Sequence, residues 1–212
     1  MGKYERFIKL LNFSFIYDAE RVFKDIVCLF AISLINKISY TKENIETYQR
    51  IYNKYSEEEQ IYIDMLTMEI ILLLKDADGP TDILGDIYKK VSNNNSLTIN
   101  NTSTKMVEFG KKIQGIISVG KNKKGNMLEL NCGSGGMILA YVRNLKLHHI
   151  DYKRKLNIVA TDLDLTKVYM TYIQLSYFEI SAVIIQLDSS NNEKLKLYTP
   201  SYFAQTEMLN VA

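Results

Sequence analysis

The sequence of 212 residues is poor in the side chains that build disulfides, zinc sites and histidine centres. Its two cysteines, Cys28 and Cys132, lie in an apolar stretch and in a glycine-rich loop, without the paired spacing of disulfide frameworks or zinc sites. Its two histidines, His148 and His149, are adjacent and are best interpreted as the end of a helix. We therefore expect neither a disulfide nor a bound metal ion.

A strong net charge and a long apolar run are also absent. The net charge of +2 leaves no basic field that would drive non-specific binding to DNA. The longest apolar run, Ile26–Ile35, is too short to span a bilayer, and the N-terminal residues show no signal-peptide pattern. We expect a cytoplasmic protein that has no membrane partner and binds DNA only weakly.

Apolar residues recur at helical spacing through the first ~90 residues. One stripe runs from Val22 to Ile35 and another from Ile45 to Tyr55. Ser56–Glu59 is a capping box that predicts the start of a third helix, which ends near Asp76–Gly79. Pro80 then starts a short fourth helix. The tyrosines in these stripes follow the helical period, so we expect them in the core or between helices rather than stacked on bases.

The second half of the chain alternates strands and helices. Polar residues from Ser92 to Thr104 predict a loop and domain boundary, and a helix follows from about Thr104 to Val119. Beyond it we predict three strands and two helices: Met127–Asn131, Gly136–Leu147, Leu156–Thr161, Thr166–Glu179 and Ala182–Leu187. This pattern favours the α/β class, with a helical region over residues 1–103 packed on a small, mainly parallel sheet in an α/β domain over residues 104–212.

The most informative segment is a predicted strand that ends in a loop with glycines at positions 133, 135 and 136, directly before a helix. This arrangement lets the backbone approach a nucleoside cofactor closely. Asp162, at the tip of the next strand, is placed to bind ribose hydroxyls, and Asp188 after the third strand could accept from an adenine amino group. Each carboxylate alone could equally cap the loop that follows it. Since Gly-x-Gly-x-x-Gly is absent, the pattern favours S-adenosylmethionine over a dinucleotide.

The residues Asn131-Cys-Gly-Ser-Gly-Gly-Met-Ile138 resemble motif I of the N6-adenine DNA methyltransferases. The similarity is greatest to methylation subunits of type I restriction-modification systems and to short orphan relatives carried by mobile genetic elements. It extends to Tyr17–Asp25, Asp82–Tyr88, Ala160–Asp164 and Tyr169–Ser176. The resemblance implies a truncated, Rossmann-like methyltransferase fold with S-adenosylmethionine as cofactor. The implied cofactor residues are Glu129, Cys132, Gly133, Gly135, Asp162 and Asp188.

Two departures from the family pattern bear on the site. The aromatic-x-Thr-Pro segment before motif I is Ile99-Asn-Asn-Thr102-Ser here, which leaves Thr102 as the implied cofactor contact. The Asn/Asp-Pro-Pro-aromatic motif that holds a flipped adenine is replaced by Thr199-Pro-Ser-Tyr202. Thr199, Pro200 and Tyr202 are the nearest candidates for catalytic residues, although a turn and a docked tail are favoured. The few residues after Tyr202 predict neither further strands nor a target-recognition domain.

Three functions remain open at this point. The favoured one is an S-adenosylmethionine-binding, methyltransferase-like protein that is catalytically incomplete alone. It would be a regulatory or anti-defence factor of a mobile element, or would need a protein partner or a second copy of itself. The alternatives are an active DNA adenine-N6 methyltransferase and a non-enzymatic interaction module on a methyltransferase scaffold. Cofactor binding separates the last from the other two, and methyl transfer to DNA separates the first two.

Overall fold

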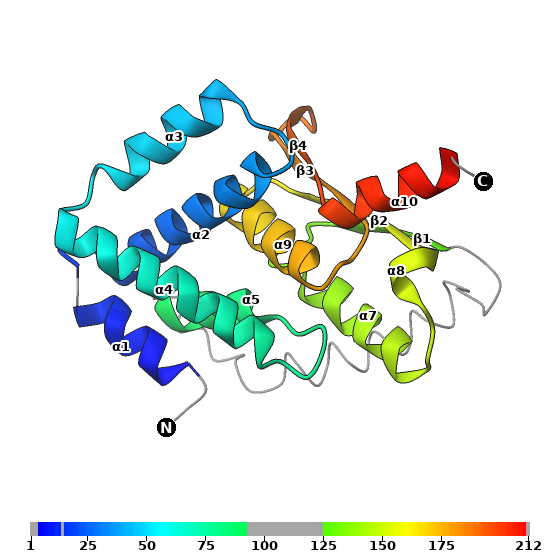
Figure 1. Ribbon diagram of the computed structural model, residues 1–212, viewed down its shortest axis with the longest axis horizontal. Coiled ribbons are helices and arrows are strands. Elements are labelled where there is room, and N and C mark those ends of the chain that lie inside the picture. The colour runs from blue at the N-terminus through cyan, green and yellow to red at the C-terminus, as the bar shows by residue number, and fades with distance from the viewer. Residues whose placement is uncertain (1–3, 14, 93–124, 211–212) are drawn as a thin grey trace. The chain divides into compact units, whose positions relative to one another are not determined.

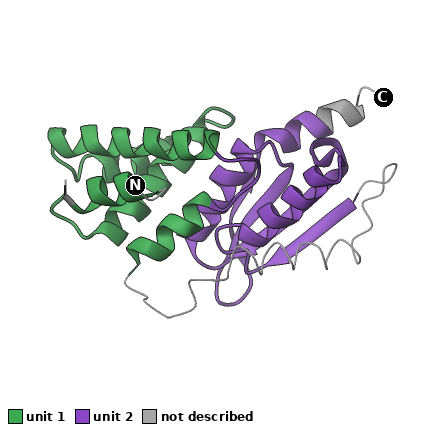
Figure 2. Cartoon of the chain, turned by 90° about the horizontal axis from the view of Figure 1, so that it is seen from below, with its two compact units in different colours: residues 1–76, 83–96 green, residues 77–82, 97–212 purple. Residues whose placement is uncertain are grey.

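The computed structural model describes residues 4–13, 15–92 and 125–210. They form a mixed α/β protein with a helical N-terminal region and a four-stranded, mostly parallel sheet (Figure 1), which confirms the predicted fold class. The chain divides into two compact units, with residues 1–76 and 83–96 in unit 1 and residues 77–82 and 97–212 in unit 2 (Figure 2). The predicted boundary between residues 103 and 104 lies outside the described residues. That boundary and the packing of the helical region on the sheet stay predictions.

Unit 1 is built around one central helix. Its described helices are α1 (Glu5–Phe13), α2 (Ala19–Asn36), α3 (Lys42–Tyr52), α4 (Glu57–Lys75) and α5 (Ile83–Val91). Helix α2 contacts the other four, and its apolar residues from Val22 to Ile32 are almost all buried. The helical stripes predicted from the sequence therefore form the core of this unit, because each stripe places its apolar side chains on one face. None of the described helices is long and apolar enough to cross a membrane.

The side chains of Asp18, Thr41 and Ser56 are the N-caps of α2, α3 and α4. The predicted capping box is present: Ser56 Oγ accepts from the backbone N–H of Glu59, and Glu59 Oε2 accepts from that of Ser56. The other carboxylate oxygen of Glu59 accepts from the backbone N–H of Ile16 at 3.1 Å. Glu59 thus ties the start of α4 to the loop before α2. The hydrogen bond from the Ser56 backbone is the main cause that lowers the pKa of Glu59 below its ordinary value of 4.5.

We expect Glu59→Gln to destabilise the protein by about 1–2 kcal/mol at pH 7, because two backbone N–H groups lose a charged acceptor. Since the folded pKa is lowered, the stabilisation by Glu59 is complete above the unfolded pKa and is lost as the pH falls through the folded pKa. Native protein and variant should therefore converge in acid. Urea unfolding followed by circular dichroism between about pH 3 and 7 measures this difference. Glu57→Gln is the matched control, because it neutralises an exposed carboxylate in the same helical turn. An equal loss in both variants would contradict the capping role.

The sheet of unit 2 has strands in the order β1 (Gly125–Leu130), β2 (Leu156–Asp162), β3 (Ala182–Leu187) and β4 (Glu193–Tyr198). Strands β1, β2 and β3 are parallel, and β4 runs antiparallel to β3. The first three strands match the predicted ones within two residues. Strand β4 was not predicted, although Glu193-Lys-Leu-Lys-Leu-Tyr198 alternates between polar and apolar residues at the period of a strand.

The described helices of unit 2 are α7 (Gly136–Leu147), α8 (Tyr152–Lys155), α9 (Leu165–Tyr177) and α10 (Pro200–Asn210). Helix α7 has the predicted bounds and ends at the C-cap His148, while α9 packs on β2 and β3. The turn expected after Thr199 is wrong, because these residues form α10, but the segment is docked as expected and contacts β3. Pro200 is its first residue, a position where the fixed φ of proline suits a helix and its missing N–H costs nothing. Tyr202 and Phe203 of α10 pack against the ring of Tyr198.

Candidate functional site

The direction of the strands gathers one set of residues at one end of the sheet. Because β1, β2 and β3 are parallel, the loop Asn131–Gly135, Asp162 and Asp188 all lie at their carboxyl ends. In open sheets of this kind ligands bind outside the carboxyl ends of the strands. The structure thus brings together the residues that the sequence proposed for a cofactor, apart from Thr102, which lies outside the described residues.

The loop after β1 has a backbone that only a few residue types adopt easily. Positive φ angles occur at every second residue, with 59° at Asn131, 57° at Gly133 and 87° at Gly135. Glycine and asparagine are the residues that tolerate this region best. The N–H groups of Cys132, Gly133 and Gly135 all donate within the protein, to two carbonyls and one carboxylate. The sequence Asn131-Cys-Gly-Ser-Gly135 therefore encodes a tight, internally hydrogen-bonded turn, which we call the cradle.

Asp162 closes this cradle from the next strand. Its Oδ2 accepts from the N–H of Gly133 at 2.9 Å, its Oδ1 accepts from the N–H of Asp164 at 3.0 Å, and the residue is buried. A buried carboxylate that is held by two backbone donors has one fixed orientation. Each oxygen has used one of its two lone pairs, so a second acceptor site remains on each. Asp162 can therefore fix the loop and accept from a ligand at the same time.

Two side chains of α9 hold the carbonyls of the loop. Thr171 Oγ1 donates to the carbonyl of Gly133 at 2.8 Å, and Gln174 Nε2 donates to that of Ser134 at 2.8 Å. Both residues are fully buried. They are three positions apart, so they lie on the same face of the helix. The loop is thus fixed through its donors by Asp162 and through its acceptors by α9.

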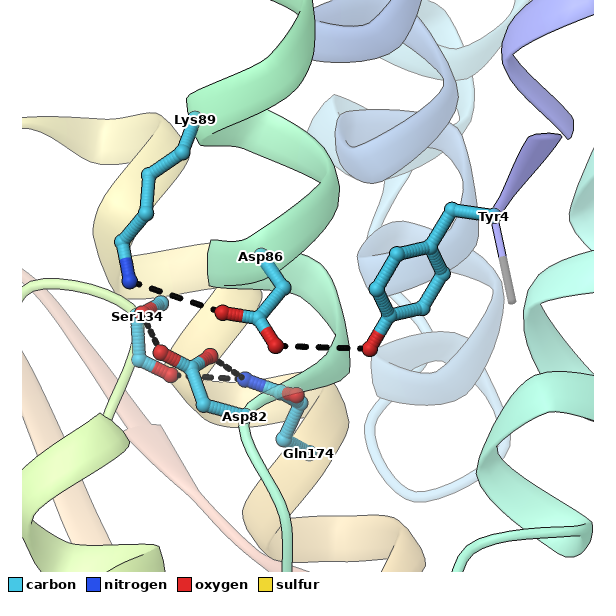
Figure 3. A network of polar contacts seen from close by, with 6 residues as sticks. All are labelled: Tyr4, Asp82, Asp86, Lys89, Ser134 and Gln174. Carbon is cyan, nitrogen blue, oxygen red and sulfur yellow. Dashed lines mark hydrogen bonds and ion pairs between the residues drawn. The ribbon is translucent and has the colours of Figure 1, made fainter. Parts of the chain in front are cut away.

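Asp82 completes the support from a distant part of the chain (Figure 3). Its Oδ2 accepts from Ser134 Oγ at 2.7 Å and its Oδ1 accepts from Gln174 Nε2 at 3.0 Å. Asp82 belongs to unit 2 through the short stretch 77–82. The sequence analysis missed the roles of Asp82, Thr171 and Gln174. The available signal was a pair of polar residues three apart on a helix that is otherwise mostly apolar.

The thiol of Cys132 is enclosed by the protein. Cys132 is buried, its backbone N–H donates to the carbonyl of Thr161 at 2.8 Å, and its Sγ lies 3.6 Å from Thr171 Oγ1. Burial raises the pKa of this thiol to about 12, and the charges of Asp162 and then Glu129 add to the rise. Such a thiol is neutral and unreactive at pH 7. Cys132 therefore serves the site through its backbone.

Glu129 is a half-buried carboxylate whose charge no described residue compensates. Burial alone raises its pKa, and within the described part of the chain no side chain or N–H donates to it. Glu129 pairs in register with Ala160, two residues before Asp162, so alternation puts Glu129 and Asp162 on the same face of the sheet. Two carboxylates near one thiol form an acidic corner beside the loop. This corner favours a ligand with a positive charge or with hydroxyl donors.

The start of α7 offers the opposite charge. Its N-cap is Gly135, and no side chain accepts a hydrogen bond from the first turn. Free N–H groups at the start of a helix, together with the helix dipole, attract carboxylates and phosphates. The loop thus has acceptors on one side and donors on the other.

The structure uses the oxygens of Asp188 in a turn. Oδ1 accepts from the N–H groups of Ser190 and Asn192 at 2.8 and 2.9 Å, and Oδ2 accepts from Asn192 Nδ2 at 3.2 Å. The bonds from Asn192, backbone and then side chain, are the main causes that lower the pKa of the Asp188 carboxyl. Asp188 therefore caps the loop that follows it, which is the alternative role that the sequence left open. The amino group of an adenine would have to compete with these donors for the oxygens of Asp188.

The three residues that the sequence suggested as catalytic lie at the end of the sheet opposite the loop after β1. Because β4 is antiparallel, Thr199 follows it at the amino end of β3, where its backbone N–H donates to the carbonyl of Ala182 at 3.1 Å. Six residues of β3 separate this position from the carboxyl end, a distance of about 20 Å. Thr199 is also fully buried, and its hydroxyl donates to the carbonyl of Ile180 and accepts from the N–H of Ala182. Thr199 therefore joins β4 to β3, and Pro200 and Tyr202 start α10 beside it.

The described residues contain no cluster of three or more histidine, cysteine or acidic side chains that could hold a metal ion.

Comparisons with known proteins identify no family for this chain. No family model matches the sequence, and no curated protein matches it significantly. Among solved structures, the chain is similar to a Listeria monocytogenes protein provisionally described as a class I S-adenosylmethionine-dependent methyltransferase. The two sequences are 12% identical, the match covers 87% of this chain and 69% of the other, and the TM-score is 0.41. A similarity of this size adds no argument about function.

The two glycines of the loop give a matched test of its geometry. We expect Gly133→Ala to cost about 1–2 kcal/mol of stability, because a Cβ there meets only the strain of a positive φ. Gly135→Ala should cost about 2–4 kcal/mol, because its Cβ would also lie 3.3 Å from the side chain of Thr171, which is hydrogen-bonded in place. Urea unfolding followed by circular dichroism measures both values. Equal losses would show that Thr171 can yield and that α9 does not fix the loop.

Proposed function

We propose that unit 2 binds S-adenosylmethionine in the cradle formed by Asn131–Gly135, Glu129 and Asp162. The observation that carries this proposal is the closed loop: alternate positive φ angles, with the N–H of Gly133 held by a buried carboxylate from the neighbouring strand. The cofactor carries a carboxylate, an ammonium group and ribose hydroxyls, and the site offers groups complementary to each. The resemblance of this loop to motif I of adenine methyltransferases supports the same ligand.

The parts of the cofactor can be matched to the site by charge. The first turn of α7 has N–H groups for the carboxylate of the methionine moiety. The uncompensated carboxylate of Glu129 suits the ammonium group, since a positive charge lowers the cost of its burial. The remaining lone pairs of Asp162 suit the ribose hydroxyls. In each of these three pairings, the fold already accounts for the orientation or the charge of the protein group.

We further propose that the chain does not methylate DNA adenine by itself. The transfer requires the target amino group to be held by acceptors beside the methyl group, because positioning supplies much of the rate. The sequence has no Asn/Asp-Pro-Pro-aromatic motif, and Thr199 is buried with its hydroxyl engaged by the backbone. A cofactor-binding protein without this site would serve as a regulatory or partner-requiring factor.

Glu129→Gln gives the sharpest test of cofactor binding. We expect the variant to bind S-adenosylmethionine about 10- to 100-fold more weakly in calorimetry, the value of one charged hydrogen bond. Stability should stay equal or rise, since the raised pKa of Glu129 shows that its charge is unfavourable in the folded protein. Glu193→Gln, which removes the same charge from β4, is the matched control and should bind as the native protein does. Native protein that binds no S-adenosylmethionine at about 1 mM would favour the interaction-module function.

A methyl-transfer assay tests the second part of the proposal. With tritiated S-adenosylmethionine and DNA that lacks adenine methylation, we expect no incorporation above a protein-free control, while an active adenine methyltransferase labels the same DNA. The reason is the missing pair of acceptors for the target amino group. Incorporation that is lost in Glu129→Gln would refute this expectation and establish the chain as an active DNA adenine-N6 methyltransferase.

A further inference from the structure

Helix α4 of unit 1 has two apolar faces, only one of which is used by the fold. The buried face consists of Ile63, Leu66, Ile70 and Leu74. Between them, a second set of large apolar side chains is exposed: Ile61 by 61%, Met65 by 44%, Met68 by 57% and Leu72 by 44%. We call these four residues the α4 stripe. Contiguous exposed apolar side chains of this kind mark interaction surfaces on soluble proteins.

The spacing of the α4 stripe is that of a helix-pairing seam. Its members follow one another at steps of four, three and four residues, which is the a and d pattern of a heptad repeat. A seam of this kind faces one other helix rather than a flat surface. Helix α4 has 19 residues and is about 28 Å long, enough for the four layers of paired side chains that the stripe would form.

The ends of the seam show which helix it fits. Glu58 precedes the stripe and Lys75 follows it, and both occupy the same heptad positions as the stripe. If two copies of α4 pack antiparallel, Ile61 lies opposite Leu72 of the second copy and Met65 lies opposite its Met68. The same alignment puts Glu58 opposite Lys75 at both ends. A parallel pair would instead place Glu58 against Glu58 and Lys75 against Lys75.

The charges beside the seam agree with this arrangement. Asp64 accepts from the hydroxyl of Tyr52 at 3.0 Å, and Glu69 lies 3.8 Å from Arg6, so both already have a polar partner within unit 1. The other charged residues of α4 are Glu57, Glu58, Glu59 and the single basic residue Lys75. A predominantly acidic helix is repelled by anionic lipids and by DNA phosphates. The chemistry therefore favours a protein helix with a complementary pattern, and α4 itself has that pattern.

We propose that this chain forms an antiparallel dimer through the α4 stripe, a property independent of cofactor binding in unit 2. One helix pair buries less area than the ~1,600 Å² of a standard stable interface. The dimer is therefore weak and forms in the micromolar range. Its two copies would be related by a two-fold axis that passes between Met65 and Met68.

The test is sedimentation equilibrium of the full chain from about 5 to about 500 μM, a range that brackets a weak association. We expect a monomer–dimer equilibrium in the native protein. Met68→Glu should weaken it at least tenfold, because a charge would be buried against Met65 of the second copy. Tyr40→Glu is the matched control: it adds the same charge at an exposed aromatic residue outside the stripe and should leave the dimer unchanged.

A charge swap tests the antiparallel register. Glu58→Lys alone should weaken the dimer about three- to tenfold at low salt, because both ends then carry like charges. Glu58→Lys combined with Lys75→Glu should restore native affinity. A native protein that stays monomeric throughout the range would overturn the proposal and leave the α4 stripe to a different protein. A Met68→Glu variant that dimerises as the native protein does would also overturn the proposal. A double swap that fails to restore affinity would overturn the antiparallel register.

Discussion

Strand direction is the constraint on which the site of unit 2 depends. Three parallel strands bring the loop after β1, Asp162 and Asp188 to one end of the sheet, while the reversal at β4 sends Thr199 to the other. No adjustment of side chains could bring Thr199 to the loop, because the length of β3 lies between them. Direction therefore separates the loop after β1 and its two carboxylates from the segment Thr199–Tyr202.

The loop itself is held almost without freedom. Donors and acceptors of its backbone are bound by Asp162, Thr171 and Gln174, and its one serine by Asp82. Such a site needs little reorganisation when a ligand arrives, which reduces the entropic cost of binding. Glu129 is the exception, since burial raises the pKa of its half-buried carboxylate and none of the described residues donates a hydrogen bond to it. Groups kept at a cost to the folded state are typical of functional sites.

Features that depend on neighbouring residues could be predicted from the sequence. The capping box of Ser56 and Glu59, the helix Gly136–Leu147 and the strand Ala182–Leu187 all rest on local patterns, and the structure has them. The orientation of a residue within the sheet could not be predicted in this way. Leu128 and Leu130 look like core residues of a buried strand, but both are exposed, because the described residues cover only one face of β1.

Non-local contacts account for the rest of what the sequence did not show. The pairing of β4 with β3 removed Thr199 from the site, and a turn of only a few residues took up the oxygens of Asp188. Asp82 had no visible function in its own segment, because its partners are 52 and 92 residues away. A local pattern contains no information about which distant polar groups will meet.

The position of Asp82 also sets the order in which the protein can finish folding during its synthesis. Gln174 leaves the ribosome 92 residues after Asp82, which at ordinary elongation rates is about 5–20 s later. Throughout that interval the helices of unit 1 on both sides of the stretch 77–82 are already available to fold, whereas the carboxylate between them waits for α9. The nascent chain can therefore complete its cradle only after α9 has emerged. A premature stop before α9 would leave a chain that has no means of closing the loop.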